Sequence, residues 1–374
     1  KMLKRFIAVT FCLFSTGLWS AEMTDPEIKE VLVFGTKTEK LKLPGSGIQI
    51  DPEELKKQDY SDLNQVITSA PGVYVREEDG FGLRPNIGIR GATSDRSQKI
   101  TLMEDGVLIT PAPYSAPAAY YITNASRLHA VEVLKGPSAI QAGPHTVGGA
   151  VNLITRPVPE QDLTEVEFTT GTDSFHKVAG AMGRVHDNFG FLFNALSYGS
   201  DGFKQLDGGG NTGFIRNDLN FKARWEPETK QKQSFTVKLG FADEDADETY
   251  LGLTDADSRR YPERRYPASE LDRFESQHRQ IHFNHSIEFT SKFHVDTKVY
   301  LNKFHRSWNK FSGFIDGPSA QNVLRDPDSY VRAYETLTGS RDSRVGYFTD
   351  LTIDVTDNNR KYSSRGVQLE LKNI

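Results

Sequence analysis

From about residue 160 onward, the chain consists largely of segments in which apolar and polar residues alternate strictly. Within 214–226, for example, Ile215, Leu219 and Phe221 alternate with charged and amide residues. Because successive side chains of a strand point to opposite faces, this period of two predicts strands with one apolar and one polar face. Eight strands are expected, at 163–171, 174–185, 189–200, 214–226, 234–242, 279–290, 293–305 and 365–374.

The connections between these strands separate two fold classes, because a secreted β-sandwich would show the same alternation. Short links at 186–188, 227–233 and 291–292 alternate with long ones, notably 243–278 and 306–364. Short turns at one end and long loops at the other are typical of an outer-membrane barrel. Loops of this length are uncommon in compact soluble domains. The pattern therefore favours an antiparallel transmembrane β-barrel.

The N-terminus carries an export signal. Basic residues among the first five precede an apolar run at 6–14, and mostly small residues follow up to Ala21. This order predicts a signal peptide at 1–21, and the run is too short to cross a membrane as a helix. Cys12 is the only cysteine, which excludes a secreted domain stabilised by disulfides. The net charge of −5 gives no support to a nucleic-acid partner.

Residues 28–157 follow a different pattern of short elements separated by Gly and Pro. Asp51 is expected to cap one helix and Ser61 a second. The expected elements are helices at 52–58 and 62–68, a hairpin about Asp105-Gly106, and strands at 131–134 and 150–155. This mixture predicts a separate α+β domain ahead of the strands.

Four spaced blocks in this domain resemble the plug of TonB-dependent outer-membrane receptors, in the order found in that family. They are Asp62-Leu63 with Ala70-Pro71-Gly72-Val73, Ile89-Arg90-Gly91, Glu104-Asp105-Gly106-Val107, and Val131-Glu132-Val133-Leu134-Lys135-Gly136-Pro137 continuing to Thr155. The resemblance implies an energy-coupled transporter of the outer membrane that works with TonB.

The resemblance also implies the architecture: a membrane all-β fold with an N-terminal α+β plug domain at 37–157, followed by an incomplete antiparallel transmembrane β-barrel at 158–374. Relatives are closed barrels of about 22 strands, of which about eight are expected here. A plug of about 130 residues has a radius of gyration of roughly 14 Å, too large for the inside of an eight-stranded barrel. The chain is therefore expected to be a fragment.

A short apolar segment lies in the region 22–36, between the signal and the plug, and resembles a TonB box. It consists of Glu30, Val31, Leu32, Val33 and Phe34. Such a β-prone segment can add as a strand to the edge of a sheet in TonB, where backbone hydrogen bonds provide affinity.

Two further segments resemble the ferric citrate receptor type, namely 111–121 and 248–254. They imply uptake of a ferric chelate. The alternative ligands are another siderophore, haem or cobalamin. The alternative class of protein is a secreted or surface adhesin. Guanidinium groups suit the carboxylates of an anionic chelate, and tyrosines add hydroxyl and aromatic contacts. The candidate ligand-binding residues are Arg84, Arg96, Tyr114, Tyr120 and Tyr121. Each arginine could instead form a salt bridge between plug and barrel.

Acidic residues cluster between the strands, at Asp243, Asp245, Asp247, Asp255 and Asp257. The stretch lacks the Gly and the final Glu of an EF-hand. It is expected to be a solvated external loop that divalent ions bridge to lipopolysaccharide in the outer-membrane lipid. No nucleophile–base pair or metal-ligand spacing is present, so we expect neither an enzyme nor a cofactor.

Overall fold

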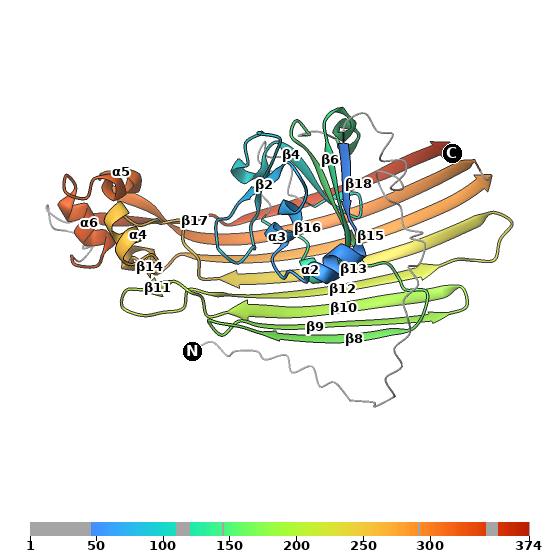
Figure 1. The fold of residues 1–374 in the computed structure, drawn as a ribbon, viewed down its shortest axis with the longest axis horizontal. Helices are drawn as coiled ribbons and strands as arrows, with labels where there is room; N and C mark the ends of the chain where they lie inside the picture. The colour runs from blue at the N-terminus through green and yellow to red at the C-terminus, as the bar shows by residue number, and fades with distance from the viewer. Residues whose placement is uncertain (1–45, 110–119, 144–145, 291, 342–350, 374) are drawn as a thin grey trace.

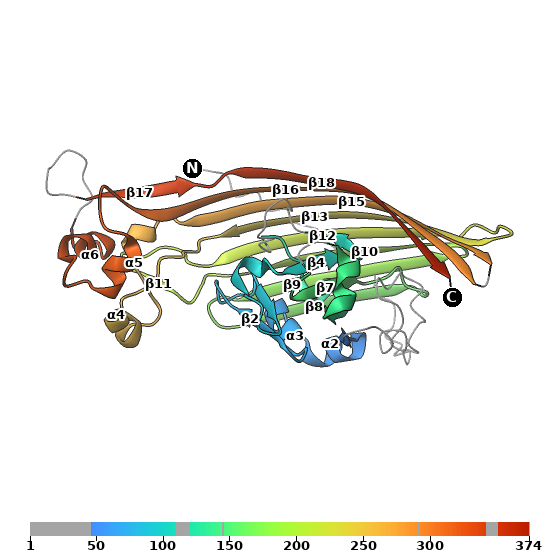
Figure 2. The ribbon, with the colours of Figure 1, turned by 90° about the horizontal axis from the view of Figure 1, so that it is seen from above.

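The computed structural model describes residues 46–109, 120–143, 146–290, 292–341 and 351–373. A small domain lies against one face of a long curved sheet, as Figures 1 and 2 show from two sides. The predicted signal peptide and TonB box lie outside the described residues. Within them, none of the helices is long and apolar enough to cross a membrane.

The small domain, called the plug below, is built on a five-stranded sheet in the order β1-β6-β7-β4-β5. Its strands are β1 Ser46–Ile50, β4 Ile100–Glu104, β5 Val107–Leu108, β6 Leu128–Lys135 and β7 Gly149–Thr155. A two-stranded sheet and five helical segments complete it: β2 Val73–Arg76, β3 Asn86–Ile89, α2 Pro52–Gln58, α3 Leu63–Thr68, η1 Asp95–Ser97, η2 Ala125–Arg127 and η3 Pro137–Ala142. Within the five-stranded plug sheet, only β4 and β7 pair in parallel.

The first helix of the plug has the predicted cap, whereas the cap of the second helix differs from the predicted one. Asp51 accepts a hydrogen bond from the backbone N–H of Glu54 at 3.0 Å, which stabilises α2. The prediction that Ser61 caps α3 was wrong. Asp62 accepts from the N–H of Asn64 at 2.7 Å instead, because the helix begins one residue later, at Leu63.

The large sheet contains nine antiparallel strands, which confirms the predicted partial barrel wall. They are β8 Leu163–Thr170, β9 His176–His186, β10 Phe189–Ser200, β12 Phe214–Trp225, β13 Lys232–Ala246, β15 Arg273–Thr290, β16 Phe293–Ile315, β17 Thr352–Asp357 and β18 Arg360–Asn373. Strands β17 and β18 pair with successive parts of β16, so together they occupy one position in the sheet. Eight positions across the sheet are therefore filled, as predicted.

Several strands are longer than predicted, which shortens the predicted loops at 243–278 and 306–364. Strand β13 continues to Ala246, where it pairs with Phe274 of β15. Strand β16 continues to Ile315 and pairs there with β17, which was not predicted. Polar residues on both faces hide the alternation in these extensions, although the backbone pairing continues. For the same reason Asp243 and Asp245 belong to β13 and not to the predicted acidic loop.

The outward face of the wall is apolar and the inward face is polar. Exposed apolar side chains on the outward face include Phe168, Leu219, Leu239, Ile281, Val299 and Leu369. Close to the short turns, exposed aromatic residues form one edge of this apolar band: Phe189, Trp225, Phe289 and Phe293. An apolar belt bordered by aromatic rings is the outer surface of a membrane barrel.

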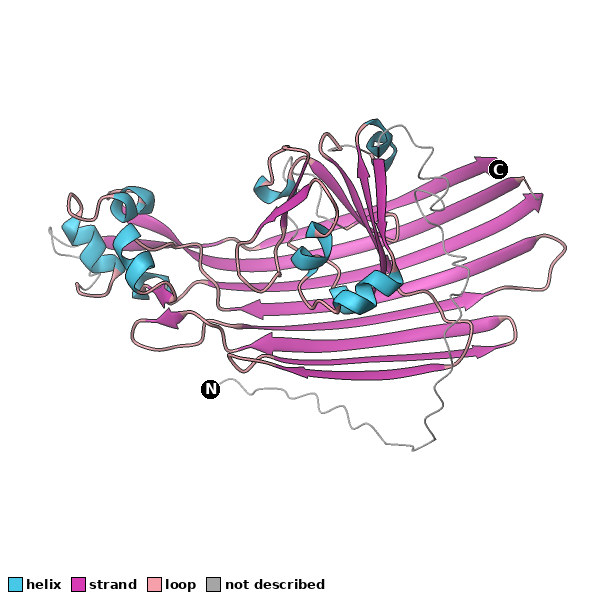
Figure 3. Cartoon of the chain, viewed as in Figure 1, coloured by secondary structure: helices cyan, strands magenta, loops and turns pink. Residues whose placement is uncertain are grey.

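The long connections at the opposite end fold together and contain α4 Asp255–Arg260, α5 Ala320–Arg325 and α6 Val331–Leu337, with η4 Pro267–Ser269 (Figure 3). The short strands β11 Gln205–Leu206 and β14 Arg264–Arg265 pair in parallel between two of these loops. Asp257 accepts hydrogen bonds from the hydroxyls of Tyr266 at 2.5 Å and Tyr334 at 2.8 Å. The prediction of a solvated acidic loop was therefore wrong for Asp257, which joins two loops.

The plug contacts the wall through the turn between β4 and β5. Glu104 is fully buried there and accepts hydrogen bonds from Lys238 and, at 2.8 Å, from Gln280. Arg127 of the plug lies 3.3 Å from the same carboxylate. Lys238 also contacts Asp105, and Lys222 lies 3.6 Å from it. We call this set the hairpin network: Glu104, Asp105, Arg127, Lys222, Lys238 and Gln280.

The charges of the hairpin network compensate one another in a buried setting. Burial alone would raise the pKa of Glu104, but Arg127 and Lys238 hold it well below its usual range. Lys222 and Lys238 likewise hold the pKa of Asp105 far below its usual value against the effect of burial. Both carboxylates are therefore ionised, and they need the wall lysines as partners.

Replacing Lys238 with Met should destabilise the intact protein by about 3–5 kcal/mol, because it leaves buried carboxylates without compensation. Lys232→Met is the matched control on the same strand. Its side chain is 67% exposed and pairs with Glu288 at 3.5 Å, so its loss should cost at most about 1 kcal/mol. Urea unfolding of the detergent-solubilised receptor measures both. Equal losses in the two variants would contradict the proposed anchoring role of the hairpin network.

Candidate ligand-binding site

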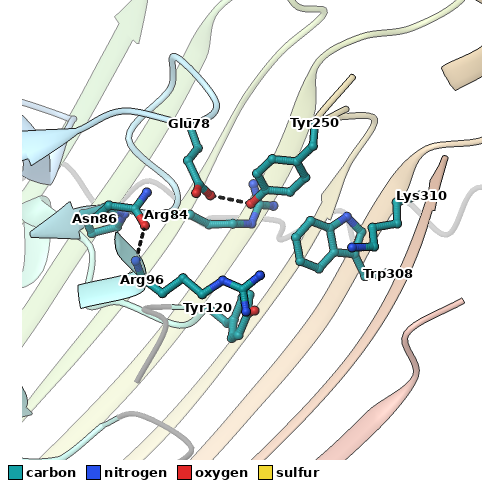
Figure 4. Close-up of a pocket in the computed structure, with 9 residues that line it drawn as sticks. Glu78, Arg84, Asn86, Arg96, Tyr120, Tyr250, Trp308 and Lys310 are labelled. Carbon is teal, nitrogen blue, oxygen red and sulfur yellow. Dashed lines mark hydrogen bonds between the residues drawn. The ribbon is translucent and has the colours of Figure 1, made fainter. Parts of the chain in front are cut away.

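A pocket lies between the plug and the wall, at the end that carries the long connections (Figure 4). It encloses about 460 Å³ of space without atoms, part of which is open solvent. Plug residues form one side of it: Glu78, Arg84, Pro85, Asn86, Arg96 and Tyr120. The other side comes from Tyr250, in the connection after β13, and from Trp308 and Lys310 of β16. The pocket therefore unites segments that are more than two hundred residues apart in the sequence.

Arg96 is held in the pocket by an unusual backbone. Arg96 and Ser97 have φ values of 49° and 52°, in the left-handed region that residues other than glycine rarely adopt. Asn86 Oδ1 accepts a hydrogen bond from the Arg96 N–H at 2.8 Å. The Ser97 hydroxyl accepts from the Ile87 N–H at 2.9 Å and donates to the Pro85 carbonyl at 3.1 Å. A residue in the left-handed region costs about 1–3 kcal/mol. The hydrogen bonds offset this cost and fix the backbone from which the Arg96 side chain extends into the pocket.

Arg84 forms a salt bridge between the plug and the wall. Its guanidinium lies 2.5 Å from Glu244 and also bonds to Glu248, and all three side chains are buried. Burial alone would lower the pKa of Arg84, but the Glu248 and Glu244 carboxylates raise it. The charge of Arg84 is therefore compensated before any ligand enters.

Aromatic rings line the pocket, and a buried arginine packs against one of them. Tyr120 lies 6.1 Å from Trp308 between ring centroids, and Tyr250 lies 4.7 Å from Trp308. Arg306 is 2% exposed and sits 3.9 Å above the Tyr120 ring. Its Nε and Nη1 atoms have no hydrogen-bond partner among the described residues. A buried guanidinium with unused donors is expected to favour a nearby anion.

The pocket has an excess of positive charge. Arg96, Lys310 and Arg306 make no ion pair with any residue that the structure describes. The acidic residue of the lining is Glu78, and it accepts a hydrogen bond from the Tyr250 hydroxyl. Burial and the Glu78 carboxylate raise the pKa of Tyr250 above its usual range, so this phenol stays protonated. The arrangement suits an anionic ligand with an apolar or aromatic portion.

The sequence prediction found part of this site. Arg84, Arg96 and Tyr120 line the pocket, whereas Tyr121 faces the hairpin network, where its hydroxyl donates to Glu104 at 3.2 Å. Tyr114 lies outside the described residues. The prediction missed Tyr250, Trp308 and Lys310 in the lining, and Arg306, which packs against Tyr120. Every second residue of a strand lies on the same face, so a strand continued past Phe304 places Arg306, Trp308 and Lys310 on the inner face with it. This alternation could have identified these three residues from the sequence.

No set of three His, Cys, Asp or Glu side chains positioned to hold a metal ion occurs in the described ranges. His282 and His285 lie on opposite faces of β15, since His282 bonds to Asn302 and His285 to Gln233. Apart from the Glu78 carboxylate, the pocket is lined mainly by hydrogen-bond donors, cations and rings, which can orient a ligand.

A family comparison identifies the plug. Residues 39–150 match the model of the TonB-dependent Receptor Plug Domain. The vitamin B12 transporter BtuB of Photobacterium profundum is 27% identical over 155 residues, which cover 41% of this chain and 25% of that protein. The probable TonB-dependent receptor BfrD of Bordetella pertussis is 34% identical over 127 residues, covering 33% of this chain and 16% of that protein. The chain thus matches a quarter or less of these relatives' length.

Solved structures extend the likeness to the wall. The unliganded ferric citrate transporter FecA matches with a TM-score of 0.62 and 22% identity, covering 73% of this chain and 42% of that one. The siderophore receptor PirA from Acinetobacter baumannii matches with a TM-score of 0.58 and 18% identity, covering 90% and 46%. At such identities the likeness establishes the fold. TonB-dependent receptors are transporters and not enzymes, and they reside in the outer membrane. Residues 39–150 therefore match the plug domain of TonB-dependent receptors, and the wall that follows has the fold of part of the barrel in these solved structures.

Proposed function

We propose that the receptor carries out TonB-dependent, energy-coupled uptake of a ferric chelate of the ferric citrate type across the outer membrane. The main support is the pocket between plug and wall. Arg96 and Lys310 line it, Arg306 packs against its Tyr120, and none of the three has a carboxylate partner among the described residues. The pocket includes Tyr250 from one of the long connections, which face the exterior in outer-membrane barrels. A ligand arriving from outside would meet this pocket before it meets the plug sheet.

The charge of the pocket favours an anionic iron chelate over cobalamin. A carboxylate-rich chelate can accept charge-assisted hydrogen bonds from the two arginines, each stronger than a neutral one. The resemblance of 248–254 to the ferric citrate type is consistent with this, since Tyr250 of that segment lines the pocket. Cobalamin remains the second candidate, because curated relatives of similar sequence are vitamin B12 transporters.

Coupling is assigned to the segment Glu30-Val31-Leu32-Val33-Phe34, which precedes the plug. A strand added to a TonB sheet holds through backbone hydrogen bonds along its length. Force on this segment would reach the plug at β1, which lies at the edge of the plug sheet and pairs there with β6.

Removing the charge of Arg96 with Arg96→Gln should weaken ferric citrate binding about tenfold, because a charge-assisted hydrogen bond contributes about 1.5–3 kcal/mol. Lys57→Gln, on the exposed side of α2, removes a plug cation outside the pocket and should leave affinity unchanged. Titration of the intact receptor with ferric citrate and with cyanocobalamin measures both. Cobalamin binding without ferric citrate binding would reject the assigned ligand class.

Replacing Val33 with Pro should abolish energised uptake while ligand binding persists, because proline removes a backbone donor from the proposed added strand. Val33→Ala keeps the N–H group and should retain most uptake. Uptake of labelled ferric citrate by cells, compared with binding to isolated outer membranes, separates the two steps. Normal uptake by the proline variant would contradict the assignment of the TonB box.

A further inference from the structure

Four basic residues form a cluster on the outer surface of the wall. Arg279 of β15 lies directly opposite Lys303 of β16. Lys303 in turn lies opposite Ser363 of β18, and Lys361 and Arg365 are two residues away from Ser363 on either side. Lys303 is therefore the centre of the cluster. Side chains on one face of neighbouring strands lie about 4.5–5.5 Å apart when directly opposite and about 7–8 Å apart on the diagonal.

The cluster faces away from the plug. Its four members are exposed, whereas their neighbours along the strands, including His278, Gln280, Asn302 and Phe304, are buried on the inner face. Because strand side chains alternate between faces, the basic residues share the outward face with the apolar band. They are not available to a ligand in the pocket.

The four cations have no carboxylate partner among the described residues. Arg279 lies 5.9 Å from the centroid of the Phe241 ring, a contact that leaves its charge uncompensated. A nearby outward cation behaves differently: Arg273 lies 2.5 Å from Asp245 and 3.1 Å from Glu275. Like charges directly opposite each other on a sheet are destabilising. An uncompensated group of four on one face therefore favours an external anion.

The height of the cluster on the wall matches the outer border of the membrane. Below it, toward the short turns, the outward residues are mostly apolar, and Ile281, Val299 and Val367 are among the exposed ones. Lys303 lies ten residues beyond Phe293 (303 − 293), the aromatic edge of the band. Ten residues of a strand tilted by about 40° rise about 25 Å, which is the height of the apolar band of an outer-membrane barrel.

We propose that Arg279, Lys303, Lys361 and Arg365 bind the phosphorylated sugar headgroup of an outer-leaflet glycolipid. Its acyl chains would lie along the apolar band below, and its phosphates would reach the cluster. This differs from the sequence-based expectation that lipopolysaccharide binds to acidic residues through divalent ions. The proposal depends on the position of the wall in the membrane and not on the transported ligand.

The test uses the intact receptor in detergent with a chelator present, so that divalent ions cannot bridge acidic residues to the lipid. Binding of diphosphorylated lipid A is measured by native mass spectrometry for the double variant Arg279→Gln/Lys303→Gln. Basic residues near a charged membrane surface contribute about 1 kcal/mol each, so affinity should fall at least about tenfold. Arg273→Gln, which removes the paired cation, should leave affinity unchanged, and Lys303→Arg should retain it. Heat-dependent mobility of the barrel on gels confirms folding of each variant.

Two competitors identify the source of the anion. Lipid A without phosphates should bind the unmodified receptor about as weakly as the diphosphorylated lipid binds the double variant, and inorganic phosphate should not displace the bound lipid. Unchanged lipid affinity in the double variant, or equal losses in the double variant and in Arg273→Gln, would overturn the proposal. Displacement by inorganic phosphate at comparable concentration would also overturn it, since the site would then hold free phosphate.

Discussion

The hairpin network holds the two bodies of this protein together. The inner face of the wall carries buried polar residues such as Lys222, Lys238 and Gln280. Because the plug excludes water from them, the plug must provide their polar partners. The plug provides Glu104 and Asp105 on a tight turn, with Arg127 beside them. Neither surface is well satisfied alone, since a buried charge that loses its partner costs several kcal/mol. The same contacts set the position of the plug, and hence of the pocket at its outer end.

Arginines of this chain differ in role according to whether a carboxylate accompanies them. Arg84 is buried against Glu244 and Glu248 and contributes to attachment of the plug. Arg96, only twelve residues later, has no such partner among the described residues and points into the pocket. On the outer surface, Arg273 is paired with Asp245, while Arg279 pairs with no carboxylate that the structure describes. In both places, the unpaired cations are the ones that we assign to anions outside the chain.

The long connections near the pocket contact one another through a small core, hydrogen bonds and an ion pair. Tyr266, Val323 and Leu337 are buried in a small core of their own, and Asp257 joins two loops through tyrosine hydroxyls. Arg264 adds a link to Asp207 in a third connection at 2.6 Å. Because these contacts cross between connections, we expect the outer end to move as one unit and not as separate loops.

The sequence alone determined most of the wall strands, two plug helices and the order of plug and wall. The period-two alternation defined the wall strands, and the caps and turns of the plug gave α2 and the Asp105-Gly106 hairpin nearly residue for residue. These features are local, so neighbouring residues carry the information. The sequence also proposed Arg96 and Tyr120, which line the pocket, but it could not separate Arg84 from Arg96. That distinction depends on Glu244 and Glu248, which lie about 160 residues away and meet Arg84 only in the folded chain.

Strand register likewise sets the pairing of Arg279 with Lys303 and the absence of a described carboxylate beside them. Only the tertiary structure decided which charges are compensated, because compensation depends on distances between residues far apart in the sequence.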